Sequence, residues 1–171
     1  IKEGVALITE DRKVTGLNLS GTVNDNIAMV AIKKLLTNGL YNKSKAYKAS
    51  QEYIEKLNIK TPSANQIVGN LSGGNQQKVV IAKWLLNEPD IIILDEPTRG
   101  IDVGAKRDIY LLLGKLVQQG KAVIMISSEI PELMGICDRV LVMCEGNDSG
   151  EVKREDFSQE RIMTLASAIT V

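Results

Sequence analysis

The residues best suited to chemistry are two neighbouring carboxylates, Asp95 and Glu96, which directly follow the apolar run 91–94. That run predicts a parallel β-strand covered on both faces. In α/β proteins ligands bind at the carboxyl edge of such a sheet, where both acids would lie. One acid could hold Mg²⁺, and the other could orient a water molecule for attack on a phosphate. A solvated Asp-Glu turn after a buried strand is the alternative interpretation.

A second group of candidate residues, Ser72, Gly73, Gly74 and Asn75, lies upstream of the acids. Ser72 is expected to cap a long helix that continues to Leu86 and is apolar nearly all round its second half. Two glycines at a helix start allow close approach of a ligand, and the exposed amides and helix dipole favour an anion. In most proteins a Ser-Gly-Gly helix start is a plain cap, so its meaning depends on the acids that follow it.

The remaining apolar periodicity predicts strands that alternate with helices, which indicates an α/β fold with a mainly parallel sheet. Strands are expected at 4–9, 91–94, 122–126 and 140–143, with a turn at 146–150 after the last strand. A first helix is expected after Thr22, with Val23, Ile27, Val30 and Ala31 on its apolar face. Further helices are expected at 45–57, at 72–86, from the cap Asp102 to Gly120, from Pro131, and around Ile162, Leu165 and Ala166. Residues 21–70 are predicted to be a helical insertion.

The composition argues against several other classes of protein. Twenty-one basic residues balance twenty-one acidic ones among 171 residues, whereas a nucleic-acid binder would carry a basic excess. Cys137 and Cys144 fit no common zinc spacing, and the sequence contains no histidine that could complete a metal site. No apolar run approaches the roughly 18 residues that a transmembrane helix needs.

Taken together, residues 71–78 and 91–98 resemble the ABC ATPase family, whose signature is Leu-Ser-Gly-Gly-Gln and whose acidic strand ends in Asp-Glu-Pro-Thr. The resemblance covers the whole chain. It implies a partial P-loop NTPase core with a mainly parallel sheet plus a helical subdomain. The expected division is a core strand and Q-loop region at 1–20, a permease-facing helical subdomain at 21–70, and a core at 71–171.

The resemblance also implies roles for individual residues, with ATP and Mg²⁺ as cofactors. ATP bound to an opposite cassette would be contacted by Ser72, Gly73, Gly74 and Asn75. In the chain's own site, Asp95 would support Mg²⁺ and Glu96 would be the general base. Glu10 would occupy the Q-loop position, Asp102 would belong to the D-loop, and Ser128 would occupy the switch position. Three of these positions depart from the family pattern: Glu10 and Asn75 replace glutamines, and Ser128 replaces a histidine. The site built on the acids is therefore expected to be slow or inactive.

No Gly-x-x-x-x-Gly-Lys-Ser/Thr loop occurs in the sequence, and the chain opens on Ile1 instead of methionine. We therefore expect a fragment that lacks its phosphate-binding loop, binds ATP very weakly and is inactive alone. The family places a further strand inside the sheet, and its absence would leave open strand edges. Self-association of the fragment is the expected consequence.

Within the family, residues 75–78, 95–106 and 127–133 look like the second of two fused cassettes in ribose, galactose and xylose importers. That likeness implies an N-terminal cassette of the same polypeptide as partner, a sugar permease, an indirect link to a sugar-binding protein outside the cell, no nucleic acid, and a peripheral location at the cytoplasmic face of the membrane. Two alternatives stay open. One is an ABC ATPase of DNA repair, whose coiled-coil insertion and basic surface are missing here. The other is a silent regulatory half that only completes its partner's ATP site.

Overall fold

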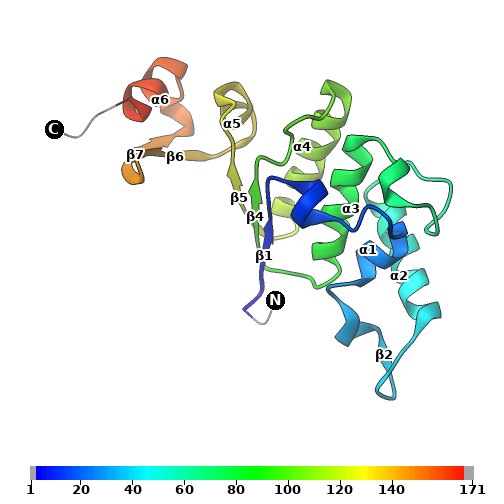
Figure 1. Cartoon of the computed structure of the whole chain (residues 1–171). Coiled ribbons are helices and arrows are strands. Elements are labelled where there is room, and N and C mark those ends of the chain that lie inside the picture. The colour runs from blue at the N-terminus through cyan, green and yellow to red at the C-terminus, as the bar shows by residue number, and fades with distance from the viewer. Residues whose placement is uncertain (1–2, 168–171) are drawn as a thin grey trace. The chain divides into compact units, whose positions relative to one another are not determined.

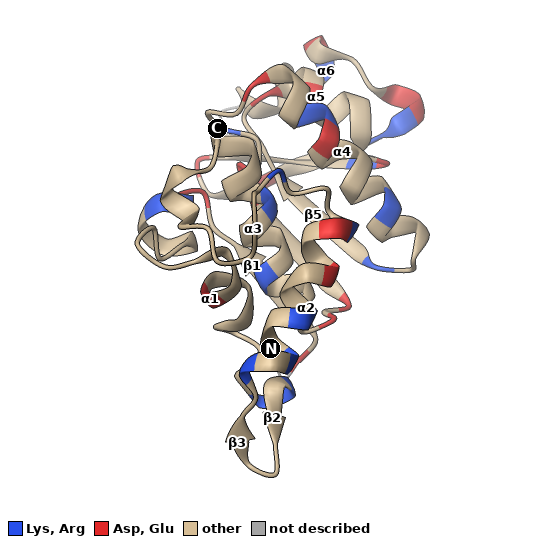
Figure 2. Cartoon of the chain, turned by 90° about the vertical axis from the view of Figure 1, so that its right-hand side faces the viewer, with Lys and Arg blue, Asp and Glu red and all other residues tan. Residues whose placement is uncertain are grey.

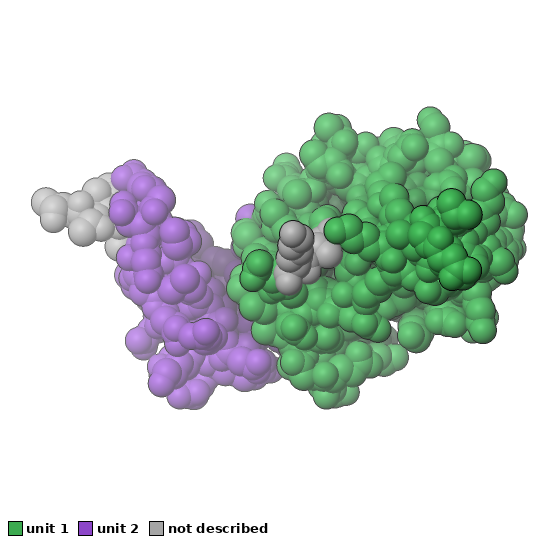
Figure 3. All heavy atoms as spheres, turned by 90° about the horizontal axis from the view of Figure 1, so that it is seen from below, with its two compact units in different colours: residues 1–126 green, residues 127–171 purple. Residues whose placement is uncertain are grey.

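A parallel sheet with strand order β1-β4-β5 forms the frame of residues 1–126, the first of two compact units (Figures 1 and 3). The computed structural model describes residues 3–167. The strands of the sheet are β1 (Val5–Ile8), β4 (Ile91–Asp95) and β5 (Ala122–Ile126). The register pairs Leu7 with Ile93 and Ile93 with Ile124, so side chains alternate between the faces in step across all three strands. All three strands lie within one residue of their predicted positions.

Among residues 3–167, helices cover one face of this sheet. Helix α3 (Gly73–Leu85) packs on β1 and α4 (Val103–Gln118) packs on β5, and Figure 1 shows the helices of this unit on one side of the strands. On the opposite face, Leu7, Ile124 and Ile126 are 48%, 51% and 50% exposed. The prediction that residues 91–94 are covered on both faces is therefore wrong, because the described part of the chain supplies helices to one face alone.

The region between β1 and α3 combines several helices with one short hairpin. Its elements are η1 (Arg12–Gly16), α1 (Val23–Ala28), η2 (Ile32–Leu35), β2 (Leu36–Thr37), β3 (Leu40–Tyr41), α2 (Lys43–Lys56) and η3 (Val68–Asn70). The predicted cap of α1 is confirmed: the Asp25 amide donates to Thr22 Oγ1 at 3.0 Å, and the Thr22 amide donates to the Asp25 carboxylate at 3.1 Å. The helix ends at Ala28, so Val30 and Ala31 lie beyond it and not on its face.

Two details of this region differ from the prediction. Helix α2 begins before the expected Lys45, because the Asn42 side chain accepts a hydrogen bond from the Lys45 amide at 2.9 Å and so caps the helix earlier. The hairpin β2–β3 was not expected from the sequence. Its turn consists of Asn38 and Gly39, whose φ angles of 50° and 81° suit a two-residue turn of the type I′ class.

Helix α3 is buried along most of its length, including two lysines. The Lys78 ammonium donates to the Asp108 carboxylate on α4 at 2.9 Å and to the Asn58 carbonyl at 3.1 Å. Near the other end of the helix, the Lys83 ammonium donates to the Gly16 carbonyl of η1 at 2.8 Å, and burial lowers the pKa of this lysine. Each buried ammonium thus ties α3 to a different neighbouring segment.

The second unit, residues 127–171, contains its own small core. Its elements are α5 (Ile130–Ile136), the antiparallel pair β6 (Arg139–Cys144) and β7 (Asn147–Lys153), η4 (Arg154–Asp156) and α6 (Gln159–Ala166). Val140, Val142, Val152 and Ile162 are buried together. Among residues 3–167 no helix combines the length and apolar character needed to cross a bilayer.

The turn predicted at 146–150 is misplaced. Glu145 and Gly146 adopt φ angles of 49° and 81° and form the turn, so the strand β7 already begins at Asn147. Polar residues and Gly150 make this strand look like a loop in the sequence. Its pairing with β6, and the burial of Val152, override the weak local preference for a strand.

Asp108→Asn tests the tie between α3 and α4. The hydrogen bond from Lys78 is the main cause that holds the pKa of the Asp108 carboxyl below its ordinary value, and the positive charge of Lys78 is the second cause. The pair therefore stabilises the fold above the unfolded-state pKa of about 3.9, and this contribution is lost as the pH falls through the lower folded-state pKa. Because the Asp108 side chain is 45% exposed, we expect the substitution to cost about 1 kcal/mol at neutral pH.

Urea unfolding of the two proteins at several pH values measures this difference. The free-energy gap between them should narrow as the pH is lowered from neutral toward the range in which Asp108 is protonated. A gap that stays constant with pH would show that the charge of Asp108 contributes nothing to stability.

Candidate functional site

The acid pair, Asp95 and Glu96, lies at the carboxyl edge of the sheet, as the sequence predicts. Asp95 is the last residue of β4 and is paired in register with Ile126 of β5. The Glu96 amide donates to the Ile126 carbonyl at 2.9 Å, and Glu96 has a φ of 45°. A left-handed conformation is unfavourable for a glutamate, and such conformations concentrate at functional sites.

The helix tip, residues 72–75 at the start of α3, is arranged differently from a plain cap. Ser72 occupies the cap position, but its hydroxyl accepts no hydrogen bond from a helix amide. Instead the Asn75 side-chain amide donates to Ser72 Oγ at 2.8 Å, and Asn75 Oδ1 accepts from the Lys60 amide at 2.8 Å. The prediction that the Ser72 side chain caps the helix is therefore wrong, because the Ser72 hydroxyl accepts a hydrogen bond from the Asn75 side chain instead. No side chain of the described residues caps the first turn, which leaves its amides suited to an anion.

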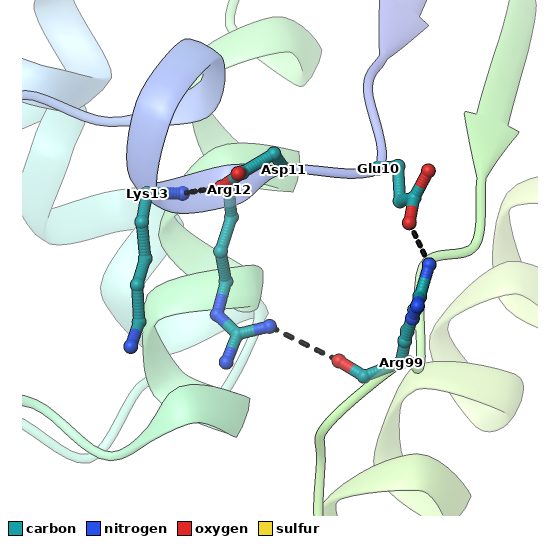
Figure 4. Close-up of a pocket in the computed structure, with 5 residues that line it drawn as sticks. All are labelled: Glu10, Asp11, Arg12, Lys13 and Arg99. Atoms are coloured by element: carbon teal, nitrogen blue, oxygen red, sulfur yellow. Dashed lines mark hydrogen bonds and ion pairs between the residues drawn. The ribbon is translucent and has the colours of Figure 1, made fainter.

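Arg12 connects the helix tip with the loop that follows the acid pair. Its Nη1 donates to the Arg99 carbonyl at 3.1 Å, and its Nη2 lies 2.8 Å from the position that a Cβ on Gly73 would take. The Arg99 guanidinium in turn forms an ion pair with Glu10, which follows β1 (Figure 4). These contacts bring the helix tip and the loop after the acid pair to the same edge of the first unit.

An open hollow of about 310 Å³ lies at this edge, lined by Glu10, Asp11, Arg12, Lys13 and Arg99 (Figure 4). Three cations face two carboxylates there, and the carboxylate of Asp11 already accepts hydrogen bonds from the amides of Lys13 and Val14 at 2.9 and 3.0 Å. The balance of charge in the hollow is therefore positive, which suits an anionic ligand.

Arg12 and Arg99 are the site residues that sequence reasoning missed. Arg99 lies in the loop after β4, whereas Glu10 lies in the loop after β1 and Arg12 is the first residue of η1, which follows that loop. Because neighbouring parallel strands end at the same edge, opposite charges in these two loops were the signal that could have revealed their contact.

Gly74 has a packing role in addition to its place in the helix tip. A Cβ on Gly74 would lie 2.4 Å from the Cβ of Ala105, which is closer than two carbon atoms can approach. Ala105 belongs to α4, and its amide donates to Asp102 Oδ1 at 3.0 Å, which confirms the predicted cap of that helix. Gly74 thus allows α3 to approach the start of α4, directly after the loop that holds the acid pair.

Ser128, the last of the predicted site residues, belongs to the second unit. It lies between β5 and α5, in a segment where Ser127 Oγ donates to the Glu132 carboxylate at 2.7 Å and accepts from the Glu129 amide at 3.1 Å. Ser128, the expected switch residue, thus lies in a hydrogen-bonded turn ahead of α5.

The acid pair fits a magnesium ion that is held mainly by a nucleotide. Among residues 3–167 no group of three or more acidic, histidine or cysteine side chains could hold a metal. Mg²⁺ in nucleotide sites is commonly bound by one or two carboxylates together with phosphate oxygens and water, so a single aspartate at a strand end is a sufficient protein ligand.

Comparison with known proteins places this geometry in a family. The model of the ABC transporter family matches residues 2–99. The ribose import ATP-binding protein of Clostridium tetani is 55% identical over 172 residues, covering 99% of this chain and 34% of that protein. The xylose import ATP-binding protein of Thermoanaerobacter pseudethanolicus is 52% identical over 167 residues, and the match covers 98% of this chain and 33% of that protein. The chain spans about a third of the length of these curated relatives.

Solved structures share the fold. An ATP-binding cassette dimer in a post-hydrolysis state, bound to ADP and phosphate, superposes with a TM-score of 0.73 at 27% identity, covering 90% of this chain and 64% of that one. An inward-facing transporter of the putative metal-chelate type superposes with a TM-score of 0.78 at 20% identity, and the match covers 94% of this chain and 62% of that one. The chain has the α/β fold of P-loop ATPases. It belongs to the ABC transporter family.

Gly74→Ala tests the close approach of α3 and α4. The added methyl group would clash with the Ala105 Cβ, so we expect a loss of about 1–3 kcal/mol of stability, as for other overpacked sites. The double variant Gly74→Ala with Ala105→Gly removes the clash and should recover most of that loss, less the roughly 1 kcal/mol that glycine costs within a helix. Urea unfolding followed by circular dichroism measures both. A double variant as unstable as the single one would show that this contact does not determine the need for glycine.

Proposed function

We propose that this chain is part of the ATP-hydrolysing subunit of a bacterial sugar importer. The observation that carries the proposal is the placement of the acid pair and the uncapped helix tip at one edge of the first unit, joined through Arg12. The ribose and xylose import proteins, which match nearly the whole chain, support carbohydrate as the transported class.

In this proposal the site works with ATP and Mg²⁺ between two cassettes. Asp95 supports the metal, whose charge neutralises the phosphates. Glu96 accepts a proton from the water that attacks the terminal phosphorus, while the bond to the ADP oxygen breaks. Asp102 faces the partner across the interface. Residues 72–75 contact the terminal phosphate of the nucleotide that the partner cassette holds.

The helix tip is mechanically linked to the segment after β1. Helix η1 is held to α3 near both of its ends, by Arg12 against Gly73 and by the hydrogen bond from Lys83 to the Gly16 carbonyl. A displacement of η1 would therefore move the helix tip as well. This link suits a protein in which binding of a permease near Glu10 controls ATP hydrolysis, and it supports the proposed Q-loop role of that residue.

A silent half that only completes the partner's site is the second candidate. Glu10, Asn75 and Ser128 all replace residues of the family pattern. In the structure the charge of Glu10 is offset by Arg99, and Asn75 is held by Ser72 and Lys60, so neither replacement disturbs the fold of the site. Ser128 cannot carry the positive charge of a histidine. A chain of this kind would serve transport without turnover at its own acid pair.

The proposed partners are an N-terminal cassette of the same polypeptide and a sugar permease, with an external sugar-binding protein acting indirectly. Residues 21–70 form the permease-facing subdomain in this proposal, residues 1–20 the Q-loop region, and residues 71–171 the rest of the core. The proposed location is the cytoplasmic face of the cell membrane, to which the permease would hold the protein peripherally.

Glu96→Gln in the importer assembled with its permease separates the two candidates. If Glu96 is the working base, ATP turnover at this site should fall by about 10²–10⁴-fold, since the amide cannot take the proton. Unchanged turnover would show that the acid pair is silent. Gly73→Asp, which places a carboxylate in the helix tip, serves as the companion variant. It should reduce ATP turnover at the partner's site whether or not Glu96 is a working base, because the helix tip completes that site.

Self-association of the 171-residue chain is also expected. The exposed side chains of Leu7, Ile124 and Ile126 form an apolar face. It lies next to the outer edges of β1 and β5, which pair with no further strand in the described part of the chain, and a second copy could cover them. Leu7→Gln with Ile124→Gln should shift the sedimentation distribution toward monomer, whereas Leu111→Gln, an equally exposed leucine on α4, should leave it unchanged. A wild-type chain that sediments as a monomer at all concentrations would contradict the expectation.

A further inference from the structure

The hairpin end of the first unit has a surface that the proposed ATP chemistry does not use. Residues 26–51 contain five lysines and no aspartate or glutamate, in a chain whose charges balance overall. The five are Lys33, Lys34, Lys43, Lys45 and Lys48, and all are exposed. Figure 2 shows basic segments around the base of the β2–β3 hairpin and at the start of α2. This end of the unit therefore concentrates positive charge.

Most of this charge is not neutralised within the protein. Lys34 forms an ion pair with Glu88 at 2.8 Å. The other four lysines form no ion pair with any residue in the described part of the chain, and the nearest acids in the sequence are Asp25 and Glu52. An uncompensated cluster of this kind repels itself and is favourable where a negative surface approaches it.

Apolar side chains project from the same segment. Leu40 in β3 is 76% exposed, Ile32 in η2 is 50% exposed, and Tyr41 is 43% exposed. None of them contributes to the core of the unit. The tight turn at Asn38 and Gly39 holds β3 in its short hairpin. A solvated lysine surface needs no exposed leucine, so the combination of both features requires a separate reason.

We propose that this surface, which we term the hairpin face (Ile32, Lys33, Leu40, Tyr41, Lys43, Lys45 and Lys48), binds an anionic lipid bilayer. The lysines would contact negatively charged headgroups, while Leu40, Ile32 and Tyr41 would enter the boundary between headgroups and acyl chains. An acidic protein or a nucleic acid would satisfy the lysines as well. The leucine and isoleucine favour lipid, because a hydrocarbon layer lies directly beneath the charged headgroups of a bilayer.

The hairpin face is independent of the proposed ATPase site. It lies on η2, β3 and α2, whereas the acid pair and the helix tip lie at the ends of β4 and α3. Binding to lipid should therefore occur without ATP and should persist in Glu96→Gln. It would hold the first unit against the membrane in an orientation set by the hairpin.

Co-sedimentation of the purified protein with vesicles tests the proposal. Vesicles of phosphatidylcholine mixed with phosphatidylglycerol should bind the protein at low salt and release it at high salt, and pure phosphatidylcholine vesicles should bind it weakly. Lys33→Gln, Lys43→Gln and Lys45→Gln combined should weaken the binding on the order of 100-fold, since each lysine near an anionic membrane contributes about fivefold. Leu40→Ser should weaken it without changing its salt dependence.

Matched variants remove the same charge and the same apolar group elsewhere. Arg107→Gln, Lys115→Gln and Lys153→Gln remove three exposed cations outside the hairpin face, and Leu111→Ser removes an exposed leucine of α4. Circular dichroism establishes that all variants fold, which is expected because every substituted side chain is exposed. Binding that the control variants weaken as much as the hairpin variants do would overturn the proposal, as would the absence of binding to the anionic vesicles.

Discussion

The close contact between α3 and the loop that follows β4 is the constraint on which the rest of this structure depends. Gly74 leaves room for Ala105, and Arg12 reaches from η1 to Gly73 and to the Arg99 carbonyl. Without these contacts the helix tip and the acid pair would be separate features of a sheet and a helix. With them, the amides that suit a phosphate and the carboxylates that suit a metal and a water lie at one edge of the first unit.

The two acids that line the hollow at this edge each have a local partner. Glu10 pairs with Arg99, and the Asp11 carboxylate caps η1, so that neither acid adds free negative charge beside the hollow. The carboxylate of Glu10, the proposed Q-loop residue, is therefore accommodated by a neighbour from the loop after β4. Any account of activity at this site has to treat Glu10 and Arg99 as a pair.

Buried lysines hold the helical part of the first unit together. Lys78 and Lys83 each lose solvent and gain a specific oxygen partner, Asp108 in one case and the Gly16 carbonyl in the other. A buried ammonium without a partner is strongly unfavourable, so these contacts select one arrangement of α3 against α4 and η1. The exposed lysines of the hairpin face show the opposite behaviour, because their charge is left for a surface outside the protein.

The sequence by itself predicted the three strands of the parallel sheet and the α-helices, the positions of the acid pair and the helix tip, and the caps at Thr22 and Asp102. Each of these follows from local periodicity or from a side chain that bonds a backbone group a few residues away. The tertiary structure decided the rest. It showed that one sheet face is exposed, that Asn75 takes the hydroxyl of Ser72, that β7 begins at Asn147, and that Arg12 and Arg99 belong to the site. The exposed sheet face and the contact of Arg12 with Arg99 depend on residues far apart in the chain, which no local pattern specifies. The Asn75–Ser72 bond joins near neighbours, but Asn75 is also held by the Lys60 amide from the preceding loop, and β7 begins where its pairing with β6 begins.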